Sequence, residues 1–143
     1  MKAALLLVPA ILALSACQRP GEVTAANAWI RLAAVPANPS AGYFTLTGGA
    51  KDATLTGVSS PAATRSEMHE SMKSGEMMSM ASVTSVALPA GGQVAFAPGG
   101  KHVMLYSLKA TAGGSVPLTF TFADGKTLTT QAKVVSAGDS APE

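Results

Sequence analysis

Both histidines of the chain and six of its seven methionines lie between Met68 and Met104. Imidazole nitrogen and thioether sulfur are both ligands for copper, and the soft thioether favours Cu(I). Zinc fits less well, because its protein sites use cysteine, histidine or carboxylate ligands rather than thioether. The residue types in this stretch therefore predict a site for one copper ion.

His102 and Met104 have the spacing of two neighbours on one face of a strand. Residues i and i+2 of a strand point to the same side of the sheet. A strand over residues 101–108 would therefore present an imidazole and a thioether side by side.

A second His/Met pair is expected on a hairpin. Ser74-Gly75 is predicted to be its two-residue turn, because glycine readily adopts a positive φ. In that register His69 lies directly opposite Met80, with their Cβ atoms about 4.5–5.5 Å apart. The two pairs together would supply four ligands.

The remaining methionines divide between the two faces of this hairpin. Met68, Met72 and Met77 alternate away from His69, so we expect them to pack in the core or at its rim. Met78 falls on the same face as His69 and is a candidate spare ligand.

These residues and their spacing resemble the signature of the PCu(A)C family of periplasmic copper chaperones. The pattern is His69, ten residues, Met80, twenty-one residues, His102, one residue, Met104. The segments similar to the family are Ala28–Arg31, Ala41–Leu46, Ser60–Ala63, Leu88–Gly92 and Pro98–Met104. The resemblance covers residues 28–135. One departure is Gly48, where family members often carry Asn, and another is the tail 136–143, which lacks a His/Met-rich extension.

The resemblance implies a cupredoxin-like Greek-key β-sandwich that binds one Cu(I) ion through His69, Met80, His102 and Met104. It also implies delivery of copper to the centres of cytochrome c oxidase, alongside a Sco-type thiol protein. Two other functions stay open: copper buffering or resistance without a dedicated acceptor, and a non-metal interaction module with an adaptable methionine-rich surface.

Several other functions find little support in the composition. A net charge of +2 gives no basic face for nucleic acid. There is no G-x-S-x-G motif or phosphate-binding loop, so no enzyme is predicted, although a Ser–His–Asp triad on either histidine stays open. Glu67 and Glu70, which flank His69, are expected to be solvated. A blue-copper site needs a cysteine thiolate, and the one cysteine, Cys17, lies far from the histidines.

The N-terminus reads as a secretory leader, with a positive start, an apolar run over residues 3–14 and then Leu14-Ser15-Ala16-Cys17. That ending resembles a bacterial lipobox and predicts acylation of Cys17. The alternative is ordinary cleavage nearby, which would leave a free thiol. We therefore expect a lipid-anchored protein of the bacterial cell envelope that faces the periplasm. Gln18, rather than Asp, after the cysteine favours the outer membrane.

The rest of the chain predicts one all-β domain, because turn residues recur about every ten positions and no helical period persists. Val116, Leu118, Phe120 and Phe122 show clear alternation. The expected division is a signal peptide (1–17), a tether (18–27), a β-sandwich domain (28–136) and a short tail (137–143). The predicted strands span 29–35, 42–47, 53–59, 64–72, 77–83, 93–97, 101–108, 116–122 and 127–135, and Leu88–Gly92 is predicted to be a loop.

Overall fold

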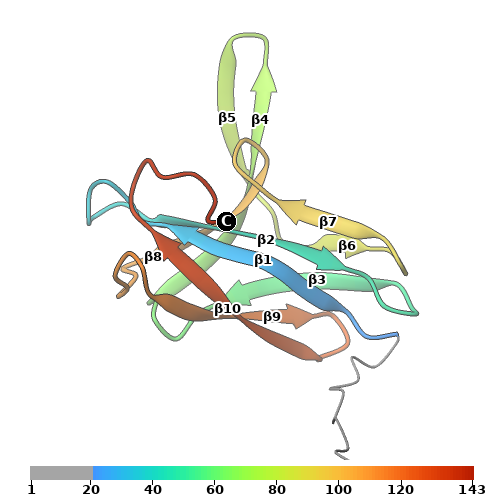
Figure 1. Ribbon diagram of the computed structural model, residues 1–143. Coiled ribbons are helices and arrows are strands. Elements are labelled where there is room, and N and C mark those ends of the chain that lie inside the picture. Colours follow the sequence, from blue (N-terminus) through green and yellow to red (C-terminus); the bar gives the residue numbers. More distant parts are fainter. Residues whose placement is uncertain (1–20) are drawn as a thin grey trace, which may run out of the picture.

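The computed structural model describes residues 21–143, and all regular elements in this range are strands (Figure 1). The predicted signal peptide, Cys17 and the start of the predicted tether lie outside the described residues. No helix long and apolar enough to cross a membrane occurs between residues 21 and 143. The strands are β1 (Thr24–Arg31), β2 (Ser40–Thr47), β3 (Ala53–Ser59), β4 (Arg65–Ser74), β5 (Met77–Ser82), β6 (Val86–Leu88), β7 (Gln93–Phe96), β8 (Lys101–Tyr106), β9 (Ser115–Phe122) and β10 (Thr127–Val135).

Neighbouring strands follow the order β5-β4-β8-β2-β1-β10-β9-β3-β6, and β7 also pairs with β2. The first and last strands, β1 and β10, run parallel, whereas the other recorded pairs are antiparallel. This order places β8 between β4 and β2, although many residues separate these strands in the chain. The all-β, cupredoxin-like Greek-key sandwich expected from the sequence is confirmed.

The core lies between the layers of the sandwich and is filled by alternating residues. On β9, Val116, Leu118, Phe120 and Phe122 are all buried, as their alternation predicted. The ring of Phe44 on β2 meets the edge of Phe120, with 4.6 Å between centroids. Full burial of each such side chain contributes about 1.5–3 kcal/mol. This core holds in place the strands that carry the candidate site.

The first strand begins earlier than predicted. β1 starts at Thr24, inside the segment expected to be a tether, and ends at Arg31 rather than Val35. Asn27 has a positive φ of 53°, and the register with β2 shifts between Ala26 and Trp29. An extra residue of this kind interrupts the period-two pattern of a strand. The alternation is therefore hidden in the sequence, which explains the error.

A short strand was missed altogether. β6 has three residues, and Leu88, which was predicted to start a loop, is its last. Val86 and Leu88 are buried and pair with β3. Three residues are too few to display an alternating pattern, so tertiary pairing decides this strand.

The β4–β5 hairpin extends beyond the body of the sandwich (Figure 1). Its turn is Gly75-Glu76, not the predicted Ser74-Gly75. Gly75 has a φ of 62° and occupies the first central position, where a type II′ turn favours glycine. As a result His69 lies opposite Ser82, and the predicted pairing of His69 with Met80 is wrong. The partner shifts by two residues, so the side chains keep their predicted faces.

Candidate metal centre

Three adjacent strands, β5, β4 and β8, form the sheet on which the predicted ligands lie. His69 on β4 pairs directly with His102 on β8, and their ring centroids are 6.0 Å apart. Residues directly opposite each other in an antiparallel pair share one face. Two imidazoles at this spacing on one face can contribute to a single metal site, since an imidazole nitrogen lies about 2.0–2.1 Å from a bound metal.

Met104 belongs to the same face as His102, because it lies two residues further along β8. It pairs across the strands with Glu67 on β4 and is half-buried. The strand predicted for residues 101–108 is therefore present as β8 (Lys101–Tyr106), with its histidine and methionine on one face.

Met80 is on the same face but is not the direct neighbour of His69. It pairs with Ser71, which makes it a diagonal neighbour of His69 across β4 and β5. Diagonal neighbours are about 7–8 Å apart and remain within reach of long side chains. The side chain of Met80 is 59% exposed, so it is free to turn toward the histidines. Met78, opposite Lys73, lies one step further toward the tip.

The other three methionines of this stretch differ in burial. Met68 is 5% exposed and packs in the core, as expected. Met72 and Met77 are 50% and 77% exposed, so the expectation that they pack at the core or its rim is wrong. They lie on the part of the hairpin beyond Glu70, the last residue of β4 that is paired with β8.

The imidazole of His102 is 6% exposed and is held by the backbone. Its Nδ1 donates to the carbonyl oxygen of Gly100, 3.0 Å away. The same oxygen accepts the backbone N–H of Ser71 on β4 at 3.1 Å. This bond leaves Nε2 as the nitrogen of His102 that carries a free lone pair.

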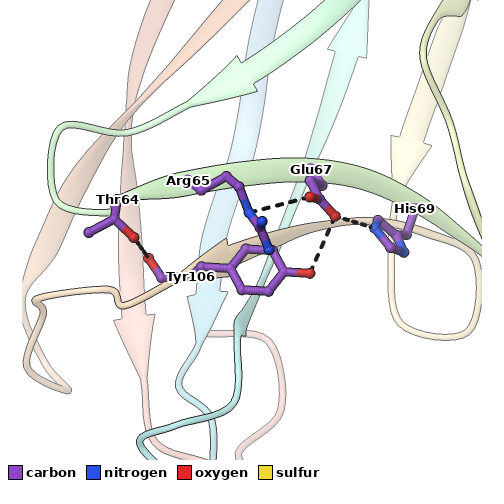
Figure 2. Close-up of polar contacts among 5 residues, drawn as sticks. All are labelled: Thr64, Arg65, Glu67, His69 and Tyr106. Carbon is purple, nitrogen blue, oxygen red and sulfur yellow. Dashed lines mark hydrogen bonds and ion pairs between the residues drawn. The ribbon is translucent and has the colours of Figure 1, made fainter.

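The imidazole of His69 is held by a carboxylate (Figure 2). Its Nε2 donates to Glu67 Oε2 at 3.0 Å, and the hydroxyl of Tyr106 donates to the same oxygen at 3.3 Å. Arg65 lies 3.3 Å from the other carboxylate oxygen and stacks over the Tyr106 ring, 4.0 Å from its centroid. The hydrogen bond from His69 is the main cause that holds the pKa of Glu67 below its ordinary value, so Glu67 is ionised at neutral pH.

The remaining nitrogen of His69, Nδ1, is buried and has no hydrogen-bond partner among the described residues. Buried polar atoms are normally paired, so an orphan of this kind requires an explanation. A metal ion bound at Nδ1 would supply the missing partner. Since no serine hydroxyl bonds to either histidine within residues 21–143, the structure does not build a Ser–His–carboxylate triad there.

Glu67 is a site residue that sequence reasoning missed, because it was expected to be solvated. The available signal was its position two residues before His69, which places both on one face of β4. Glu70 lies on the opposite face and forms an ion pair with Lys101 at 3.1 Å. Residues 21–143 contain no group of three or more histidine, cysteine, aspartate or glutamate side chains that could hold a metal.

Comparisons with known proteins agree with this fold. The family model described as "Putative lipoprotein LpqE-like" matches residues 23–134. The protein named "Putative lipoprotein Lxx21020" of Leifsonia xyli subsp. xyli is 32% identical over 120 residues, which cover 79% of this chain and 72% of that protein.

Two solved structures are also similar. The copper-bound PCuAC domain from PmoF2 has a TM-score of 0.67 and 21% identity, covering 82% of this chain and 96% of that one. The Cu(I) form of DR1885 from Deinococcus radiodurans has a TM-score of 0.60 and 28% identity, covering 85% and 81%. The chain therefore belongs to the LpqE-like lipoprotein family, and its β-sandwich is a domain of the PCu(A)C type.

Proposed function

We propose that this protein is a copper chaperone of the cell envelope that carries one Cu(I) ion and delivers it to the copper centres of cytochrome c oxidase. The ligands are His69, Met80, His102 and Met104. The observation that carries the proposal is that all four lie on one face of the β5-β4-β8 sheet, where His69 Nδ1 is buried without a partner. The similar structures of PmoF2 and DR1885, which are named as copper-bound, support it.

The ligand set favours Cu(I) over harder or more strongly charged ions. Two neutral imidazoles and two neutral thioethers suit a soft monovalent cation, whereas zinc sites use cysteine, histidine or carboxylate ligands and not thioether. A thioether also cannot be lost to disulfide formation in an oxidising compartment. The site needs no turnover chemistry, and the protein is proposed to act as a carrier rather than an enzyme.

The unequal burial of the ligands suits release. His102 is buried on β8, whereas Met80 is exposed on the projecting hairpin. A partner that approaches the hairpin can replace the exposed thioether first, with copper still held by the histidines. An acceptor with two thiolates offers softer, negative ligands, so transfer by ligand exchange should run from this site to the acceptor. A Sco-type thiol protein would act as the intermediary in this transfer.

We further propose that acylated Cys17 anchors the protein to a membrane on its periplasmic side, in agreement with its family of lipoproteins. Several acyl chains give stable anchoring. A tether raises the local concentration of the donor near an oxidase in the same membrane. An outer-membrane location would instead require a soluble intermediary.

The test has two stages. First, the protein is loaded anaerobically with Cu(I), and the bound metal is measured after gel filtration; one copper per chain is expected. The loaded protein is then mixed with a reduced, copper-free dithiol fragment of the oxidase, and copper is followed after separation. Copper that stays on the donor, with an acceptor shown to bind free Cu(I), would contradict delivery and favour the buffering alternative.

The non-metal interaction module is the second candidate, and the exposure of the hairpin methionines favours it. Met72, Met77, Met78 and Met80 are each at least half exposed, and flexible methionines suit adaptable binding surfaces. The first stage separates the two functions, since an interaction module would retain no stoichiometric copper.

A further inference from the structure

We propose that Glu67 is the positioning residue of the site, which fixes the ring of His69 so that Nδ1 binds copper, while His102 binds through Nε2. The inference rests on the proposed function and deepens it, because it names the atom that each histidine offers. It also assigns a role to a carboxylate that does not itself touch the ion.

The nitrogen of His69 is selected by the chemistry of its partner. An ionised carboxylate only accepts hydrogen bonds, so His69 Nε2, at 3.0 Å from Glu67 Oε2, must carry the proton. A neutral imidazole has one N–H, and the lone pair is therefore on Nδ1. This is the atom that is buried without a partner among the described residues.

The carboxylate of Glu67 is itself fixed. Tyr106 donates its hydroxyl to the oxygen that receives His69, and Arg65 lies 3.3 Å from the other oxygen. These two residues are cross-strand partners, and the Arg65 guanidinium stacks on the Tyr106 ring (Figure 2). The network limits rotation of Glu67 and, through it, of the His69 ring. Carboxylates that hold metal-bound histidines in this way orient the ring and raise its basicity.

A different hydrogen-bond acceptor orients His102, and it places the proton on the other ring nitrogen. The carbonyl oxygen of Gly100 also only accepts hydrogen bonds, and it lies 3.0 Å from Nδ1. The proton is therefore on Nδ1, and Nε2 is free to bind the ion. The two histidines are held by acceptors on opposite ring nitrogens, so we assign them different ligand atoms.

The first experiment records the tautomers directly in the copper-free protein by NMR with 15N-labelled histidine at neutral pH. We expect His69 to be protonated at Nε2 and His102 at Nδ1, and Cu(I) to shift the 15N signals of His69 Nδ1 and His102 Nε2. The opposite tautomer at His69, or a copper shift at its Nε2, would overturn the proposal.

The second experiment measures Cu(I) affinity by competition with a chromophoric chelator. Glu67→Leu should weaken affinity about 10–100-fold, the range for loss of such a partner. Glu67→Gln keeps an acceptor oxygen and should restore most of the affinity. Glu70→Gln is the matched control, because Glu70 lies on the other face and pairs with Lys101, and it should change affinity less than twofold.

Circular dichroism checks that each variant is folded, and Tyr106→Phe gives a milder perturbation of the network if Glu67→Leu does not fold. Equal affinities for the wild type and Glu67→Leu would overturn the positioning role. Failure of the wild type to bind Cu(I) would instead contradict the proposed function, whereas the tautomers of the copper-free protein would still be measured. The two hypotheses can therefore fail separately.

Discussion

His69 and His102 are direct cross-strand partners on β4 and β8, although 32 residues lie between them in the chain. The backbone pairing of these strands determines the distance between the imidazoles before any metal binds. On each side the strands continue into the sheet, with β5 beyond β4 and β2 beyond β8. The histidine half of the site is thus preorganised, and binding should require movement mainly from the methionines.

The first prediction concerns the two histidines. His69→Ala and His102→Ala should each weaken Cu(I) binding by at least about tenfold, which corresponds to about 1.4 kcal/mol. Chelator competition under anaerobic conditions measures the change. Ser82→Ala is the matched control, because Ser82 is the observed partner of His69 on β5 and offers no copper ligand. Affinities of both histidine variants within twofold of the wild type would rule out the histidines as ligands.

The second prediction concerns Gly48, which follows the last residue of β2. A Cβ at this residue would collide with the carbonyl oxygen of Pro89, and the backbone N–H of Gly48 donates to Gly92 at 2.7 Å. Gly48→Ala should therefore destabilise the domain by about 1–3 kcal/mol, the usual cost of overpacking. Urea unfolding followed by tryptophan fluorescence measures it.

Gly57→Ala provides the control for that experiment. A Cβ at Gly57 meets no atom within 4 Å, and its φ is not in the positive range. The free energy of unfolding of the Gly57→Ala variant should stay within about 1 kcal/mol of the wild type. It can also rise, because alanine reduces the conformational entropy of the unfolded chain. Equal stabilities for the Gly48 and Gly57 variants would show that the contact with Pro89 relaxes without cost.

The third prediction concerns Cys17, which lies outside the described residues. If the lipobox interpretation is right, Cys17→Ser should abolish acylation and move the protein from the membrane fraction to the soluble fraction. Mass spectrometry of the wild type should find acyl groups on Cys17. Membrane association of the variant, combined with an unmodified cysteine in the wild type, would support the ordinary signal peptide instead.

The fold was largely predictable because alternation and turn residues are local signals. β9 displays its buried face in the sequence, and the turn that follows it contains Asp124-Gly125, where Gly125 has a φ of 84°. β1 was misplaced because the irregularity at Asn27 breaks the alternation. β6 was missed because three residues carry too little pattern.

The sequence predicted which residues belong to the candidate site better than it predicted how they are arranged. Parity predicts that His69 shares a face with Met80 and His102 with Met104, and a two-residue shift of register does not change this. That the two pairs share one face follows only from the pairing of β4 with β8. Parity does not determine the direct cross-strand partner of His69. That partner depends on whether Gly75 occupies the first or the second central position of the hairpin turn. The role of Glu67 required knowledge that β4 pairs with β8, because Tyr106 approaches it only through that pairing.

The last prediction separates the methionines by face and by distance along the hairpin. Met80→Leu and Met104→Leu should each weaken Cu(I) binding about tenfold or more with little change in stability, because leucine and methionine have similar volumes. Met78→Leu should have a smaller effect, since Met78 lies two residues further from His69 on the same face. Met72→Leu, on the opposite face, should have none and serves as the control. Anaerobic chelator titrations of the four variants give the order, and an effect of Met78→Leu equal to that of Met80→Leu would contradict the choice of Met80 over Met78 as the ligand.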